Sequence, residues 1–165
     1  MKAIIAALAA LAGFASPALA ENTILRIPNA NPQAPILSGV VVPAGTTLVY
    51  LSGQVPAAAD KTLPADSIAA YGDTKAQAIS VFEKTKALLA AQKLGLGDVI
   101  KLTVFLVGDP KLGGKLDFKG FNEAYSLYFG TAEQPNKVAR SVVQISALAN
   151  PGFLVEVEAI AATKR

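Results

Sequence analysis

The sequence contains no cysteine, no histidine and no tryptophan, and it has a single methionine. Because thiolate and imidazole groups are missing, Ser-His-Asp and Cys-His catalysis, zinc sites made of His or Cys, and disulfide bonds are all excluded. Any catalysis must therefore use carboxylates, amines, guanidinium groups, hydroxyls or the backbone.

The sequence also lacks an excess of either charge, because it has 15 Lys and Arg residues and 12 Asp and Glu residues. The resulting net charge of +3 indicates solubility and does not identify a partner. Lys84, Lys86 and Lys93 lie along one expected helix, where they read best as its solvated side. A basic stripe for RNA is the weaker alternative, since neither aromatic stacking platforms nor a strongly basic patch is present. We expect no nucleic-acid partner.

The first 20 residues have the pattern of a secretory signal peptide. Lys2 precedes an apolar run over residues 3–14, then Ser16-Pro17 interrupts the helix, and residues 18–20 read Ala-Leu-Ala. A membrane anchor is the alternative, but the run is much shorter than the roughly 20 apolar residues that span a bilayer. We expect residues 1–20 to be cleaved after Ala20. Residues 21–165 would then form one periplasmic or secreted domain with no membrane contact.

The mature sequence predicts six strands and two helices in the order β-β-β-α-β-α-β-β. Strands are expected over residues 23–27, 39–42, 47–52, 99–107, 140–148 and 153–161, and helices over 74–94, between Asp73 and Gly95, and over 118–129 after Asp117. A helical turn is expected within the loop at 56–72. The second and third strands, and likewise the last two, are close enough in sequence to form hairpins. This order predicts an α+β fold with one sheet and both helices on one face.

The last two expected strands have two different faces. Alternation places Arg140, Val142 and Gln144 on one side of the first strand, and Glu156 and Glu158 on one side of the second. We predict that these sides share one face, which is too polar for a core and too apolar for open solvent. Such a face is typical of a subunit interface with a polar pocket.

Arg140 is the candidate binding residue on physical grounds alone. A planar guanidinium is the usual two-pronged partner of a carboxylate. The alternative is a structural ion pair with Glu158 or another acid, which is the ordinary behaviour of an arginine at a strand end.

Five segments of the sequence carry a resemblance to a known family. They are residues 51–56 (LSGQVP), 98–105 (DVIKLTVF), 121–125 (FNEAY) with 128–130 (YFG), 139–145 (ARSVVQI) and 154–161 (LVEVEAIA). With these motifs the chain resembles the RidA (YjgF) family of enamine/imine deaminases over roughly residues 36–161.

The resemblance implies a fold, an assembly and an activity. The fold is the chorismate-mutase-like one, with a six-stranded mixed sheet and two helices on one face, assembled as a homotrimer with a cleft at each subunit interface. The activity is hydrolysis of 2-imino acids, such as 2-iminopropanoate or 2-iminobutanoate, to 2-oxo acids and ammonia, with no metal or organic cofactor. A carboxylate-binding or chaperone-like protein without catalysis is the alternative on this scaffold, and RNA cleavage is a less favoured third class.

The resemblance also assigns roles to individual residues. Arg140 would hold the substrate carboxylate, together with the backbone N–H of Val142. Glu156 would position the water that attacks the imine carbon, and Gly53 would line the cleft.

Three segments depart from the family pattern, besides the leader. Many deaminase members carry a tyrosine where residues 36–38 read Ile-Leu-Ser, so one substrate contact is missing. Val142 stands where some members have cysteine, which is harmless if only its N–H is used. The loop at 108–116 is longer than in compact members.

Overall fold

The computed structural model describes residues 23–164, and the expected signal peptide over residues 1–20 lies outside them. The elements follow the expected order of six strands and two helices, with three short 3₁₀ turns between them. They are β1 (Leu25–Ile27), β2 (Gly39–Val41), β3 (Thr47–Gln54), η1 (Ile68–Ala70), α1 (Thr74–Ala91), η2 (Leu96–Asp98), β4 (Val99–Val107), η3 (Pro110–Leu112), α2 (Phe118–Tyr125), β5 (Ala139–Ile145) and β6 (Val155–Thr163).

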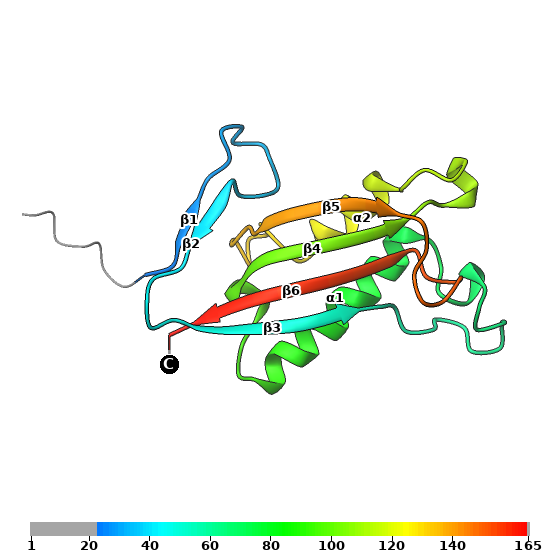
Figure 1. Cartoon of the computed structure of the whole chain (residues 1–165), viewed down its shortest axis with the longest axis horizontal. Coiled ribbons are helices and arrows are strands. Elements are labelled where there is room, and N and C mark those ends of the chain that lie inside the picture. The colour runs from blue at the N-terminus through cyan, green and yellow to red at the C-terminus, as the bar shows by residue number, and fades with distance from the viewer. Residues whose placement is uncertain (1–22, 165) are drawn as a thin grey trace, which may run out of the picture.

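The strands form two sheets instead of the single six-stranded sheet that we expected. A four-stranded mixed sheet has the order β3-β6-β4-β5, and β1 pairs only with β2 (Figure 1). The α+β class with both helices on one face of a mixed sheet is confirmed. Both expected hairpins are wrong, because β3 pairs with β6 instead of β2, and β4 separates β5 from β6.

Burial explains why β6 and not β5 takes an inner position. Val155, Val157, Ala159 and Ala161 of β6 are all buried, so this strand gains from a neighbour on each side. Strand β5 is more exposed and pairs in parallel with β4 alone, which makes it an edge strand. The short connection between β5 and β6 suggested a hairpin. The apolar strands β4 and β6 pair with each other instead, because both are buried.

Both helices begin where the sequence predicted, since Asp73 and Asp117 accept hydrogen bonds from backbone N–H groups in their first turns. Both end earlier than predicted. Helix α1 stops at Ala91 because Lys93 adopts a left-handed conformation with φ of 60°, a role we had expected of Gly95. Helix α2 stops at Tyr125, and only turns continue to Phe129.

The helices cover one face of the four-stranded sheet and bury the core there. Val81, Phe82 and Leu89 of α1 pack with Phe121 and Tyr125 of α2 against the buried side chains of β4 and β6. The opposite face, called the open face below, has no helix over it among the described residues (Figure 1). It carries Tyr50, Ser52, Lys101, Thr103, Phe105, Ser141, Val143, Glu156, Glu158 and Ile160.

The small β1–β2 sheet is fixed to the rest of the chain by a few specific contacts. Arg26 donates hydrogen bonds to the carbonyl oxygens of Gly97, Val99 and Lys137 at 2.7–3.0 Å. Leu37 donates its N–H to Val138 O at 2.9 Å and bridges in parallel to Ala139. The segment that precedes β2 is thereby held against the start of β5. None of the helices in the described part of the chain is long and apolar enough to cross a membrane.

Candidate functional site

Arg140 projects from edge strand β5 into a group of aromatic rings on α2. Its guanidinium carbon lies 4.4 Å from the ring centroid of Tyr125, 5.3 Å from Phe121 and 5.9 Å from Phe118. One guanidinium nitrogen, Nη2, donates a hydrogen bond to Asn122 Oδ1 at 2.7 Å. Helix α2 therefore supplies the whole environment of this cation that the structure records.

The other two guanidinium nitrogens of Arg140, Nε and Nη1, are buried and have no hydrogen-bond partner in the described chain. Burial lowers the pKa of Arg140 from its ordinary value, and the electrostatic interaction with Tyr125 opposes that shift. The group stays cationic, because an arginine does not lose its proton in proteins. Unpartnered buried donors on a cation are costly. Neighbouring side chains cover both atoms, so an anion that accepts from them must displace part of that cover.

The structural alternative for Arg140, an ion pair with Glu158, is not what the structure shows. Among the described residues the recorded ion pairs join Lys75 and Lys119 to Glu123. Arg140 contacts an amide oxygen and aromatic rings instead.

Asn122 is a site residue to which the sequence analysis gave no role, although it lies within the FNEAY motif. A signal was available in the helix period, because Phe118, Phe121, Asn122 and Tyr125 are spaced at i, i+3, i+4 and i+7 and so share one helix face. Asn122 lies on this helix face beside the aromatic residues, and its side-chain oxygen accepts the hydrogen bond from Arg140.

Gly53 and Glu156 are brought together by the pairing of β3 with β6. A side chain at residue 53 would overlap the Glu156 carboxylate, with its Cβ only 2.7 Å from Glu156 Cδ. The missing side chain of Gly53 therefore leaves the room in which this carboxylate lies. Val142, the fourth expected site residue, is half-buried and packs against the core from β5.

Arg140 and Glu156 lie on opposite faces of the sheet, which contradicts our prediction of one shared face. The register of β4 shows this, because Arg140 pairs with Leu102 while Glu156 pairs with Phe105. Residues three apart on a strand point to opposite faces. The error followed from treating β5 and β6 as a hairpin, in which the two mixed sides could have been neighbours.

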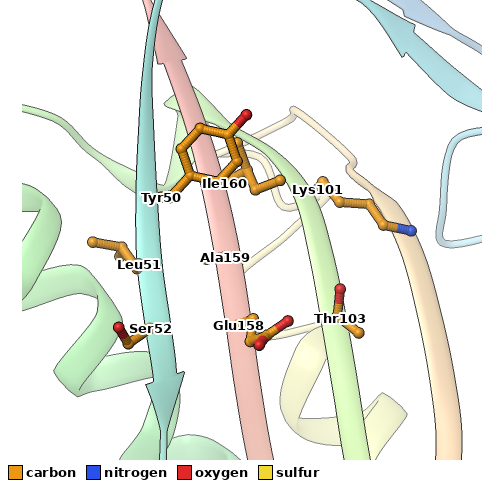
Figure 2. Close-up of a pocket in the computed structure, with 8 residues that line it drawn as sticks. All are labelled: Tyr50, Leu51, Ser52, Lys101, Thr103, Glu158, Ala159 and Ile160. Carbon is orange, nitrogen blue, oxygen red and sulfur yellow. The ribbon is translucent and has the colours of Figure 1, made fainter.

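The open face carries both polar and apolar side chains. A cavity of about 240 Å³ on this face is lined by Glu158 and not by Glu156. Figure 2 shows Ser52, Thr103 and Glu158 below Tyr50 and Ile160. Lys101 at the rim of the cavity points toward β5 and donates to Ser141 Oγ at 2.9 Å. Tyr50 is 70% exposed and Val143 is 44% exposed.

No group of three or more acidic residues in the described part of the chain is placed to hold a metal ion. The chemistry that these residues can supply is that of a cation, a carboxylate, an amide and hydroxyl groups.

The contact between Gly53 and Glu156 leads to a direct prediction. We expect Gly53→Ala to displace the Glu156 carboxylate and to lower any turnover that depends on it by about 10-fold or more, since misplacing a reacting group by about 1 Å is costly. Gly97→Ala is the matched control, because a Cβ there meets its nearest atom at 3.6 Å. Steady-state kinetics with both variants makes the comparison, and equal activities would mean that Glu156 is not part of the reaction.

Comparisons with known proteins give consistent results. The family model described as endoribonuclease L-PSP matches residues 31–163. The protein DfrA of Myxococcus xanthus is 42% identical over 127 residues, which are 77% of this chain and 84% of that one. The Escherichia coli protein named "Putative reactive intermediate deaminase TdcF" is 34% identical over 116 residues, 70% of this chain and 78% of its own. A crystal structure of E. coli TdcF with bound serine aligns at a TM-score of 0.54 and 32% identity, covering 84% of this chain and 94% of that one.

Proposed function

Because the chain belongs to the endoribonuclease L-PSP family, also known as the RidA or YjgF family, we propose that it hydrolyses reactive 2-imino acids such as 2-iminopropanoate. The products are the 2-oxo acid and ammonia. The relative named as a reactive intermediate deaminase supports this reaction class. The structure of TdcF with bound serine supports a ligand that carries a carboxylate.

The observation that carries the proposal is the pair of buried, unpartnered nitrogens of Arg140. A substrate carboxylate that displaces part of their cover would satisfy donors that nothing else in the described chain satisfies. Asn122 holds the third nitrogen, and the rings of α2 fix the plane of the group. The backbone N–H of Val142, two residues further along β5, completes the proposed carboxylate site.

Glu156 supplies the proposed proton transfers. It accepts a proton from water as the water oxygen bonds to the imine carbon, and it returns the proton to nitrogen. The tetrahedral adduct is then a carbinolamine, with one hydroxyl and one amino group on the carbon. Its hydroxyl proton passes to nitrogen through the same carboxylate as the carbon–nitrogen bond breaks, so that ammonia leaves and the carbon–oxygen double bond of the 2-oxo acid forms. One water is consumed for each imine, so the reaction balances without an oxidant, a reductant or a metal.

A complete site requires two copies of the chain, since Arg140 and Glu156 lie on opposite faces of one sheet. We place the cleft where the open face of one copy meets α2 and the β5 edge of the next, within a cyclic homotrimer. The exposed apolar side chains of the open face favour such an assembly.

Release of ammonia tests the proposal. Iminopyruvate can be generated in the assay by an amino-acid oxidase acting on alanine, and its spontaneous hydrolysis is measured without the protein. We expect the protein to accelerate ammonia release over that background by 10-fold or more, in line with the typical contribution of general acid–base catalysis. A rate equal to the background at micromolar protein would exclude the deaminase activity.

A carboxylate-binding protein without turnover is the second candidate. It is favoured by the position of Arg140 and Asn122, which lie together in one copy, so the proposed carboxylate-holding half of the site needs no second copy. Calorimetric binding of pyruvate without ammonia release from the imine would identify this case.

We also propose that the protein is exported and starts at Glu21 in its mature form, because residues 1–20 have the signal-peptide pattern. Intact mass of protein recovered from the periplasm or medium gives the cleavage site. Recovery of a species that retains the leader would overturn this.

A further inference from the structure

We propose that Tyr125 is a positioning residue that links the Arg140 guanidinium to the segment preceding β2. Its ring would orient the cation, and its hydroxyl would fix the backbone at Pro35. This inference rests on the proposed role of Arg140 as the carboxylate ligand, and it assigns to a core tyrosine a task that packing alone does not require.

The ring of Tyr125 makes the shortest of the three aromatic contacts with Arg140, at 4.4 Å from its centroid. A desolvated guanidinium gains more from the face of a ring than an exposed one does. Arg140 is such a group, because it is largely buried and one hydrogen bond to a side chain is recorded for it. The ring face therefore replaces part of the hydration that Arg140 has lost.

The ring is itself held rigidly. Tyr125 is fully buried, stacks on Phe129 with 4.9 Å between centroids and a 16° tilt, and meets the edge of Phe82 at 6.4 Å. A side chain packed on both sides cannot follow the cation if the cation moves. The orientation of Arg140 is thus set by the core.

The hydroxyl of Tyr125 reaches a different part of the chain. It donates a hydrogen bond to Pro35 O at 3.0 Å. The same segment is held by Leu37 N–H on Val138 O at 2.9 Å and by Lys137 Nζ on Ala34 O at 2.7 Å. These bonds fasten the segment to β5 just before Arg140. Burial raises the pKa of Tyr125 above its ordinary value, so the hydroxyl keeps its proton and remains a donor.

Four variants separate the two parts of Tyr125 from general packing. Tyr125→Phe keeps the ring and removes the hydroxyl, with its bond to Pro35 O and its backbone hydrogen bond with Val138, while Tyr125→Leu removes the ring as well. Tyr128→Phe and Tyr128→Leu are the matched controls, because Tyr128 packs on Phe82 and donates to Glu83 without touching Arg140. Thermal denaturation of all four gives the structural cost of each change.

Two measurements read the site. Calorimetry gives the dissociation constant of pyruvate, and proton–nitrogen spectra give the Arg140 Nε–H signal, assigned by its loss in Arg140→Lys. We expect Tyr125→Leu to weaken pyruvate binding by about 5- to 30-fold, as the loss of a desolvated cation–ring contact predicts, and to shift the Nε–H signal. Tyr125→Phe should keep the ring-shifted signal and weaken binding by a few-fold as the Pro35 segment loosens. The Tyr128 variants should change neither reading.

The outcomes distinguish this proposal from the proposed function. If wild type does not bind pyruvate but the Nε–H signal still responds to Tyr125→Leu and not to Tyr128→Leu, the positioning role stands and the ligand is wrong. If the Tyr125 and Tyr128 variants lose stability alike and leave both readings unchanged, Tyr125 is a packing residue only. Should Tyr125→Leu fail to fold, Tyr125→Phe decides through its few-fold loss of affinity, and an unchanged affinity would overturn the link to Pro35.

Discussion

Arg140→Ala is expected to abolish pyruvate binding and imine turnover together. The substitution removes a cation that can make two charge-assisted hydrogen bonds to one carboxylate, each contributing about 1.5–3 kcal/mol, so we expect affinity to fall by about 100-fold or more. Arg140→Lys should restore little, because an ammonium cannot reproduce the planar fork or lie flat against the Tyr125 ring. Calorimetry with pyruvate and the ammonia assay measure both effects.

Lys119→Ala is the control for Arg140, because it removes a highly exposed cation from α2, the same helix that surrounds the guanidinium. Its binding and turnover should match wild type within about two-fold, as expected for a screened surface charge. If Arg140→Ala unfolds the chain or changes its assembly while a folded fraction still binds pyruvate normally, the arginine is structural.

Much of the local structure could be predicted from the sequence because its causes are local. The aspartates before each helix correctly predicted where the two helices start, because their side chains accept backbone hydrogen bonds in the first turn. The strand expected over residues 99–107 is present as β4, with β5 on one side and β6 on the other. The end of α1 was missed because Lys93, and no glycine, adopts the left-handed conformation. Nothing in a lysine's own preferences predicts that.

The pairing of strands could not be predicted, and the geometry of the site depends on it. Alternation correctly separated Arg140 from Ser141 and Glu156 from Val157, but it does not say which side of β5 matches which side of β6. That depends on β4 lying between them, a contact that is distant in sequence. Asn122 was missed for the same reason, since its importance appears only when β5 brings Arg140 to α2.

Glu156→Gln is expected to separate chemistry from binding. It keeps the size of the side chain beside Gly53 and removes the carboxylate that accepts the proton of water, so turnover should fall by about 100-fold or more while pyruvate binding persists. Glu158→Gln is the matched control, because Glu158 lies on the same open face two residues further along β6, while the side chain that a Cβ at Gly53 would meet first is that of Glu156. Equal losses in the two variants would point to a general effect of charge on the open face.

Mixing the two inactive variants is expected to restore activity. Light scattering should first confirm a trimer. If each site takes Arg140 from one copy and Glu156 from its neighbour, then random reassembly of Arg140→Ala with Glu156→Gln subunits in equal amounts leaves about one site in four intact, since each of the two contributions is wild type in about half of the cases. Ammonia release should therefore rise from near background to about a quarter of the wild-type rate.

The double variant mixed with Arg140→Ala is the control and should stay at background. Absence of rescue in a mixture shown by mass spectrometry to contain mixed trimers would mean that both residues of a site come from one copy, which the opposite faces of Leu102 and Phe105 on β4 argue against.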